Sequence, residues 1–95
     1  MPKGYWIAHV AVTDAENYPK YVEAARPAFV RYNAKFLARA GRYTQYEGED
    51  RARNVIIEFA SYEDACACYE SAEYQVAKAI RIQHSTGSIV IVEGT

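Results

Sequence analysis

The segment from residue 54 to residue 74 constrains the fold of this chain more than any other part. A run of β-branched and aromatic residues, Val55 to Phe59, is typical of a strand. The pattern from Ser61 to Asp64 that follows it is typical of a capped helix N-terminus, and Ser71 offers a second helix start. The strand passes into the helix without the glycine-rich loop that a phosphate-binding turn would need. The segment therefore predicts an architecture but no particular reaction.

The length and charge of the chain limit its class. With 95 residues, of which 51% are hydrophobic and 24% charged, it is expected to fold as one globular domain over residues 1–95. The formal net charge is −1 and no basic block occurs, which argues against a nucleic-acid partner. The aromatic content of 14% is high for this size, so part of the aromatic surface is expected to meet a partner subunit.

Several absences set the expected location and chemistry. No apolar run approaches the roughly 18 residues that cross a bilayer, and the N-terminus has no apolar signal core. Cys66 and Cys68 lie two apart on a predicted helix, where they point to nearly opposite sides and lack the spacing of a metal site. We therefore predict a cytoplasmic protein with no membrane contact, no metal and no cofactor.

The hydrophobic pattern predicts four strands and two helical regions. The expected strands are 5–12, 35–39, 54–59 and 88–93; the expected helices are 17–32, kinked or broken before Pro27, and 62–83, restarted at Ser71. This βαββαβ order predicts an α+β, ferredoxin-like fold, with a four-stranded antiparallel sheet and two helices on one face.

The strands also predict which residues the helices leave uncovered. Val55, Ile57 and Phe59 alternate toward the helices, together with Trp6 and Val10 on the first strand. The residues expected on the other, open face are Tyr5, Ile7, His9, Ala11, Asn54, Ile56 and Glu58. A monomer would expose this partly apolar face to water, so we expect it to form an interface.

Short motifs distributed from Gly4 to Gly94 together resemble those of one bacterial family. They are Gly4-Tyr5-Trp6-Ile7-Ala8-His9-Val10, Tyr18 with Tyr21, Phe36-Leu37-x-Arg39-x-Gly41, Glu47-Gly48, Arg53 to Phe59, Ser71-x-Glu73-Tyr74-Gln75 and Ile91-Val92-Glu93-Gly94. The chain resembles domain-of-unknown-function family 1330, in the dimeric α/β-barrel superfamily. The resemblance implies a homodimer in which two open sheet faces pack together as a barrel. It implies no single reaction, because the superfamily includes oxygenases, isomerases and haem-dependent enzymes.

Two residues of the expected open face, His9 and Glu58, are the candidates for catalysis. An imidazole titrates near neutral pH and can carry a proton, and a carboxylate on the neighbouring strand could orient it. We therefore predict that His9 and Glu58 are neighbours across adjacent strands. The alternative is that both are polar groups of a dimer interface that satisfy each other.

Arginines and tyrosines supply the candidates for ligand binding. Arg39 and Arg53 could hold a carboxylate, because guanidinium geometry suits that group, although salt bridges to nearby acidic residues would explain them equally well. We name Arg39, Tyr32 and Asn33 as ligand-binding candidates.

Two functions remain open at this point. The first is a homodimeric barrel that binds a small-molecule ligand and acts on it without a cofactor, by proton transfer or oxygen chemistry. The second is a ligand-sensing or interaction module without catalysis. An RNA-recognition module shares the strand order, but its third strand needs an aromatic and basic consensus, and here that strand carries Glu58.

Overall fold

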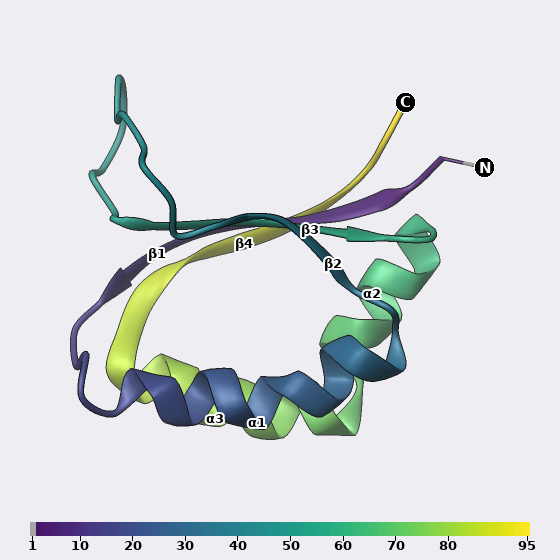
Figure 1. Cartoon of the computed structure of the whole chain (residues 1–95), viewed down its shortest axis with the longest axis horizontal. Coiled ribbons are helices and arrows are strands. Elements are labelled where there is room, and N and C mark those ends of the chain that lie inside the picture. The colour runs from purple at the N-terminus through teal and green to yellow at the C-terminus, as the bar shows by residue number, and fades with distance from the viewer. Residues whose placement is uncertain (1) are drawn as a thin grey trace.

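The computed structural model describes residues 2–95 as an antiparallel four-stranded sheet with its helices on one side (Figure 1). The elements are β1 (Gly4–Val12), α1 (Tyr18–Arg31), β2 (Lys35–Arg39), β3 (Arg53–Phe59), α2 (Tyr62–Glu70), α3 (Ala72–His84) and β4 (Ser85–Glu93). The strands lie in the order β2-β3-β1-β4, which confirms the predicted ferredoxin-like arrangement. The predicted restart at Ser71 divides the second helical region into α2 and α3, so three helices rather than the two of the predicted fold cover the sheet.

Serine side chains account for that division. The amide of Asp64 donates to Ser61 Oγ at 3.0 Å, which caps α2 as predicted. Ser71 ends α2 in an extended backbone conformation, and its Oγ then accepts from the amide of Tyr74 at 3.2 Å to cap α3. A single serine therefore closes one helix and starts the next.

The buried sheet face matches the sequence pattern. Trp6 and Val10 of β1, and Val55, Ile57 and Phe59 of β3, are all buried beneath the helices. The alternate residues of both strands lie on the opposite, open face. The predicted division of the two strands into a helix-facing and an open side is confirmed.

Pro27 does not break α1. The helix is continuous from Tyr18 to Arg31, although Pro27 removes the amide that would bond to the carbonyl of Glu23. Pro27 lies on the exposed side of the helix, while Ala25 and Ala28 are fully buried beside it. Water can hydrate the exposed side of a helix, so the lost hydrogen bond costs less there. The expected break is absent, and a kink at Pro27 stays a prediction.

An irregularity in β2 determines the direction of Arg39. Phe36 pairs with Ile57 and Ala38 pairs with Ile56, so two residues of β2 are opposite one residue of β3. The shift brings Arg39 opposite the buried Val55, on the side of the sheet that faces the helices. Sequence alternation alone would have placed Arg39 on the open face.

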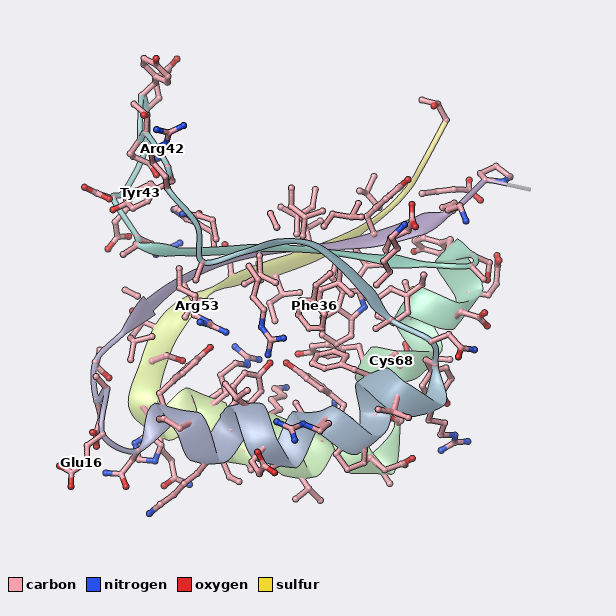
Figure 2. The ribbon with its side chains drawn as sticks, in the orientation of Figure 1. Glu16, Phe36, Arg42, Tyr43, Arg53 and Cys68 are labelled. Atoms are coloured by element: carbon pink, nitrogen blue, oxygen red, sulfur yellow. The ribbon has the colours of Figure 1, made fainter. Side chains whose placement is uncertain are left out.

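The open face of the sheet is exposed and largely aliphatic. Its exposed residues are Ile7, Leu37, Ile56, Val90 and Val92, each with between 38% and 56% of its surface accessible. Ile7 of β1 pairs with Ile56 on one side and with Val90 on the other, so the apolar strip crosses the middle of the sheet. Residues 40–52 form a loop that rises from the sheet on this side, away from the helices, and carries Arg42 and Tyr43 (Figures 1 and 2).

Candidate functional site

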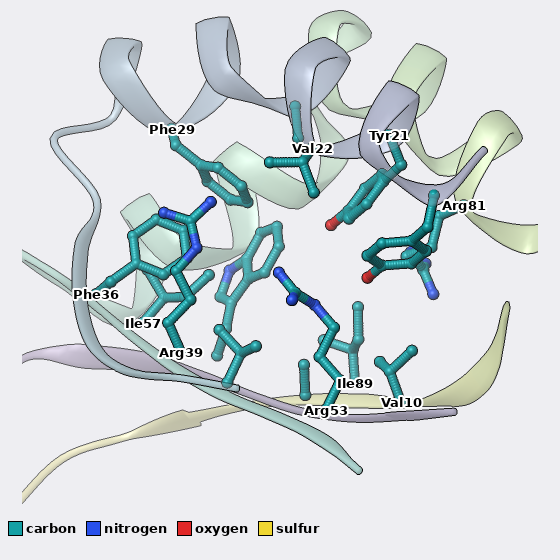
Figure 3. A pocket seen from close by; sticks show the side chains of 15 residues that line it. Val10, Tyr21, Val22, Phe29, Phe36, Arg39, Arg53, Ile57, Arg81 and Ile89 are labelled. Carbon is teal, nitrogen blue, oxygen red and sulfur yellow. The ribbon is translucent and has the colours of Figure 1, made fainter. Parts of the chain in front are cut away.

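A partly enclosed pocket lies between the sheet and helices α1 and α3 (Figure 3). Its cavity is about 30 Å³, which is enough for a small group or about two waters. The lining is mostly apolar and aromatic: Trp6, Ala8, Val10, Tyr18, Tyr21, Val22, Ala25, Phe29, Phe36, Arg39, Arg53, Val55, Ile57, Arg81 and Ile89. We refer to this space as the sheet–helix pocket.

Trp6 forms one wall of the sheet–helix pocket and is held rigidly. Its indole Nε1 donates to the carbonyl of Ala65 at 2.8 Å, so the ring's only polar atom is satisfied by α2. The ring packs edge-on against Phe29 and Tyr74, with centroids 5.4 and 4.9 Å apart. These contacts leave Trp6 as a fixed aromatic surface for any occupant.

Tyr21 and Tyr74 provide a polar contact close to that wall. Their hydroxyl oxygens lie 2.8 Å apart, and one donates to the other. Burial raises the pKa of both phenols above the usual range, so both keep their protons at neutral pH. Neither tyrosine can therefore serve as a base at neutral pH.

Three arginines from three different elements line the sheet–helix pocket, and we call them the arginine trio: Arg39 of β2, Arg53 of β3 and Arg81 of α3. Figure 3 shows Arg39 and Arg53 rising from the sheet and Arg81 entering from the helix. Each guanidinium lies near an aromatic ring, at 4.3 Å from Phe36, 5.2 Å from Tyr18 and 5.9 Å from Tyr21 respectively.

The salt bridges considered as an alternative explanation for Arg39 and Arg53 do not form among the described residues. Within residues 2–95, the ion pairs of arginine involve Arg26, Arg31 and Arg51, and Glu49 pairs with Arg51 at 2.8 Å. The salt-bridge explanation for Arg39 and Arg53 is therefore excluded within this part of the chain. Their guanidinium groups pair with no acidic side chain there.

The ligand-binding candidates Arg39, Tyr32 and Asn33 are only partly brought together. Arg39 lines the sheet–helix pocket, and Asn33 lines a shallow outer groove that shares Arg39, Phe29 and Phe36 with it. Tyr32 lines neither space; it packs beside the core, with the guanidinium of Arg31 5.0 Å from its ring.

The predicted contact between His9 and Glu58 is wrong. Both lie on the open face, as expected, but His9 pairs with Asn54 and Glu58 pairs with Tyr5, four residues further along the strand. That offset separates His9 from Glu58 by about 13 Å. His9 bonds instead through Nδ1 to Asn54 Oδ1 and through Nε2 to the carbonyl of Glu49 at 2.9 Å.

His9 and Glu58 lie on the opposite face of the sheet from the arginine trio. Tyr5 donates to Glu58 at 3.4 Å on the open face, whereas the trio lies beneath the helices. A catalytic role for His9 or Glu58 stays a prediction, and each residue would have to act with a different neighbour.

Arg81 is the site residue that sequence reasoning missed. The sequence contained a pattern that marks Arg81, because Tyr74, Ala77 and Arg81 follow the spacing of one helix face. In the structure all three are buried. An arginine on the buried face of an amphipathic helix is uncommon without a partner, and that pattern could have marked it.

Two further features of the described chain bear on function. No helix within residues 2–95 is long and apolar enough to cross a membrane. The same residues contain no group of three or more histidine, cysteine, aspartate or glutamate side chains placed to hold a metal ion.

The sheet order, the helices on one face and the pocket between them define a ferredoxin-like α+β protein. The chain belongs to the family Domain of unknown function (DUF1330), whose profile matches residues 3–95. Among curated proteins, none has a matching sequence.

Solved structures share the fold at low identity. A protein of unknown function from Rhodopseudomonas palustris is 16% identical, with a TM-score of 0.78 over 99% of this chain and 83% of that one. SnoaB, a cofactor-independent oxygenase from Streptomyces nogalater, is 9% identical, with a TM-score of 0.64 over 100% and 95%. A dimeric ferredoxin-like protein of unknown function from Thermobifida fusca is 16% identical, with a TM-score of 0.52 over 97% and 89%.

Proposed function

We propose that this protein is a homodimeric α/β barrel that binds a small organic molecule in the sheet–helix pocket. The observation that carries the proposal is the pocket itself, a partly enclosed space with a rigid aromatic wall and few polar groups. The cavity itself holds only a small group, so the apolar body of such a ligand would extend into the outer groove that shares Arg39, Phe29 and Phe36 with it, while the few polar side chains fix orientation.

The open face supports the dimer. Five aliphatic side chains that are 38–56% exposed form a strip across the sheet, and covering that remaining surface contributes roughly 1 kcal/mol each, about half the value for full burial. A second copy of the chain would cover the strip with an identical one. The similar protein from Thermobifida fusca is dimeric, which is consistent with this arrangement.

If the protein is an enzyme, it acts on the bound molecule without a cofactor. SnoaB, which shares the fold, is a cofactor-independent oxygenase. In such a reaction the bound molecule itself must lose a proton or supply electrons to oxygen, and the protein stabilises the negative charge that results. The arginine trio is placed to do so.

A ligand-sensing module without catalysis is the second candidate, and the lining of the pocket favours it. The residues of the pocket described above include no histidine, cysteine, aspartate or glutamate. The pocket therefore has no side chain whose ordinary pKa lies near 7 to serve as a general base.

Native mass spectrometry of the purified protein tests the proposal directly. We expect the mass of a dimer, with a retained small molecule that denaturing conditions release. Trp6 is the single tryptophan and lines the pocket, so its fluorescence should change when the molecule is added back. A monomer without any such response would contradict the proposal, and ligand-dependent oxygen uptake or proton exchange would select the enzyme over the sensor.

A further inference from the structure

The arginine trio places three positive charges around one small cavity. Arg53 lies between Arg39 and Arg81 in Figure 3, so the charges line the length of the pocket. No acidic side chain is among the lining residues that the structure describes, and the formal net charge of the whole chain is only −1. The positive potential is therefore local to the pocket, where like charges repel one another.

Arg81 is the most buried arginine of the trio and has a donor without an acceptor. It is only 8% exposed, and its Nε is buried without a hydrogen-bond partner. Its position in the last turn of α3 is favourable for a cation, but that field does not supply an acceptor to Nε. A buried cation with an open donor is costly, and an anionic acceptor would offset the cost.

On the basis of the proposed function of the pocket, we propose that its ligand is the anion of a small organic acid, held by Arg39, Arg53 and Arg81. The anion is a carboxylate, or an ionised phenol or enol, on a flat apolar body. Guanidinium groups bind such oxygens through paired N–H donors, and the aromatic wall accepts a flat ring.

The position of each arginine suggests how the anion lies. Arg81 is buried at the inner end and would meet the charged oxygens, whereas Arg39 is exposed and belongs to the mouth. The cavity of about 30 Å³ holds only a small group, so the ring would extend past the exposed Arg39 into the outer groove, which shares Phe29, Phe36 and Arg39 with the pocket. Because the trio favours the charged form of a bound acid, a weak acid should ionise more readily in the pocket than in water.

Two matched probes, benzoate and its neutral isostere benzamide, test this inference by calorimetry and by the fluorescence of Trp6. We expect benzoate to bind at least about tenfold more tightly than benzamide, the ratio for one charge-assisted contact. The Arg53→Gln and Arg81→Gln variants should each lose about tenfold or more of the benzoate affinity, with benzamide changed less than about threefold. Arg31→Gln is the control, because Arg31 forms an exposed ion pair with Glu73 outside the pocket.

A third probe reports ionisation directly. 4-Nitrophenol absorbs in the visible only as its phenolate, so a titration in the presence of protein gives the pKa of the bound phenol. We expect that pKa to fall by about one unit or more, and the fall to disappear in Arg53→Gln.

The outcomes separate this inference from the proposed function. Equal binding of benzoate and benzamide, or full benzoate affinity in folded variants of the trio, would overturn the anionic ligand while leaving a pocket for neutral molecules. Binding of neither probe would also overturn the anionic ligand, and native mass spectrometry would then decide separately whether the pocket holds another molecule. If Arg81→Gln fails to fold, as circular dichroism would reveal, the half-buried Arg53 alone carries the test.

Discussion

The hydroxyl oxygens of Tyr21 and Tyr74 lie 2.8 Å apart and join α1 to α3 beside the sheet–helix pocket. Tyr74 is fully buried and Tyr21 nearly so, so each hydroxyl depends on the other as a partner. The bond spans 53 residues of sequence and fixes the separation of the two helices that cover the pocket. It is therefore expected to stabilise both the fold and the shape of the site.

Removing one hydroxyl should show this dependence. Tyr74→Phe leaves the hydroxyl of Tyr21 buried without its partner, which should lower the free energy of unfolding by about 1–2 kcal/mol in urea titrations. Adding Tyr21→Phe should then cost little more, because no unpaired hydroxyl remains. Fully additive losses in this double-mutant cycle would mean that the two hydroxyls do not stabilise each other.

The raised pKa values of buried groups predict weakening at alkaline pH. Burial raises the pKa of the Cys68 thiol from 9.0 to about 12, and burial raises those of Tyr21 and Tyr74 above 10.0. The unfolded chain therefore releases these protons first, so stability is full below about pH 9 and falls as pH rises. Each such proton should contribute about 1.4 kcal/mol per pH unit to the slope of the unfolding free energy.

A cysteine variant separates the contributions. Between pH 9 and pH 10 the decline should come mainly from Cys68, so Cys68→Ala should flatten the curve there and leave the steeper fall above pH 10. An unfolding free energy that stays level from pH 8 to pH 11 would contradict the assignment.

Strand parity predicted the two sheet faces because side chains alternate strictly along a strand. Val55, Ile57 and Phe59 could only pack together on one side, and they do. Parity cannot supply register, however, since sliding β1 past β3 by two or four residues keeps every face unchanged. That freedom is why Glu58 was expected beside His9, whereas the true partner of His9 is Asn54.

The site was harder to predict than the fold for a related reason. Arg39 faces the pocket because β2 contains an extra residue, and no residue type in that strand predicts such a bulge. Arg81 lies 28 residues beyond Arg53 in the chain and lines the same pocket only through the packing of α3 on the sheet. Local pattern therefore found the individual elements, while the arginine trio depends on how they pack.

His9 provides a test of whether the two sheet faces act independently. His9→Ala removes both bonds of the ring, to Asn54 and to the carbonyl of Glu49, so residues 40–52 should exchange amide hydrogens faster. Benzoate binding in the pocket should change less than about twofold, because His9 lies on the opposite face. Ser88→Ala is the control, since Ser88 is the other strand neighbour of His9 and is exposed. Loss of benzoate binding in a folded His9→Ala protein would instead connect His9 to the pocket.

The dimer interface can be tested at Ile56. Ile56→Lys places a charge in the centre of the aliphatic strip, opposite Ile7, and a symmetric dimer would bury that charge twice. Because an unpaired charge costs several kcal/mol to bury, the dissociation constant should rise by at least about 100-fold. Sedimentation velocity should then show monomer or aggregate, while circular dichroism keeps its helical signal. Ile82→Lys, at a 60% exposed position on α3, makes the same chemical change on the helical side and should remain dimeric. A dimer that withstands Ile56→Lys would place the subunit contact somewhere other than the open face.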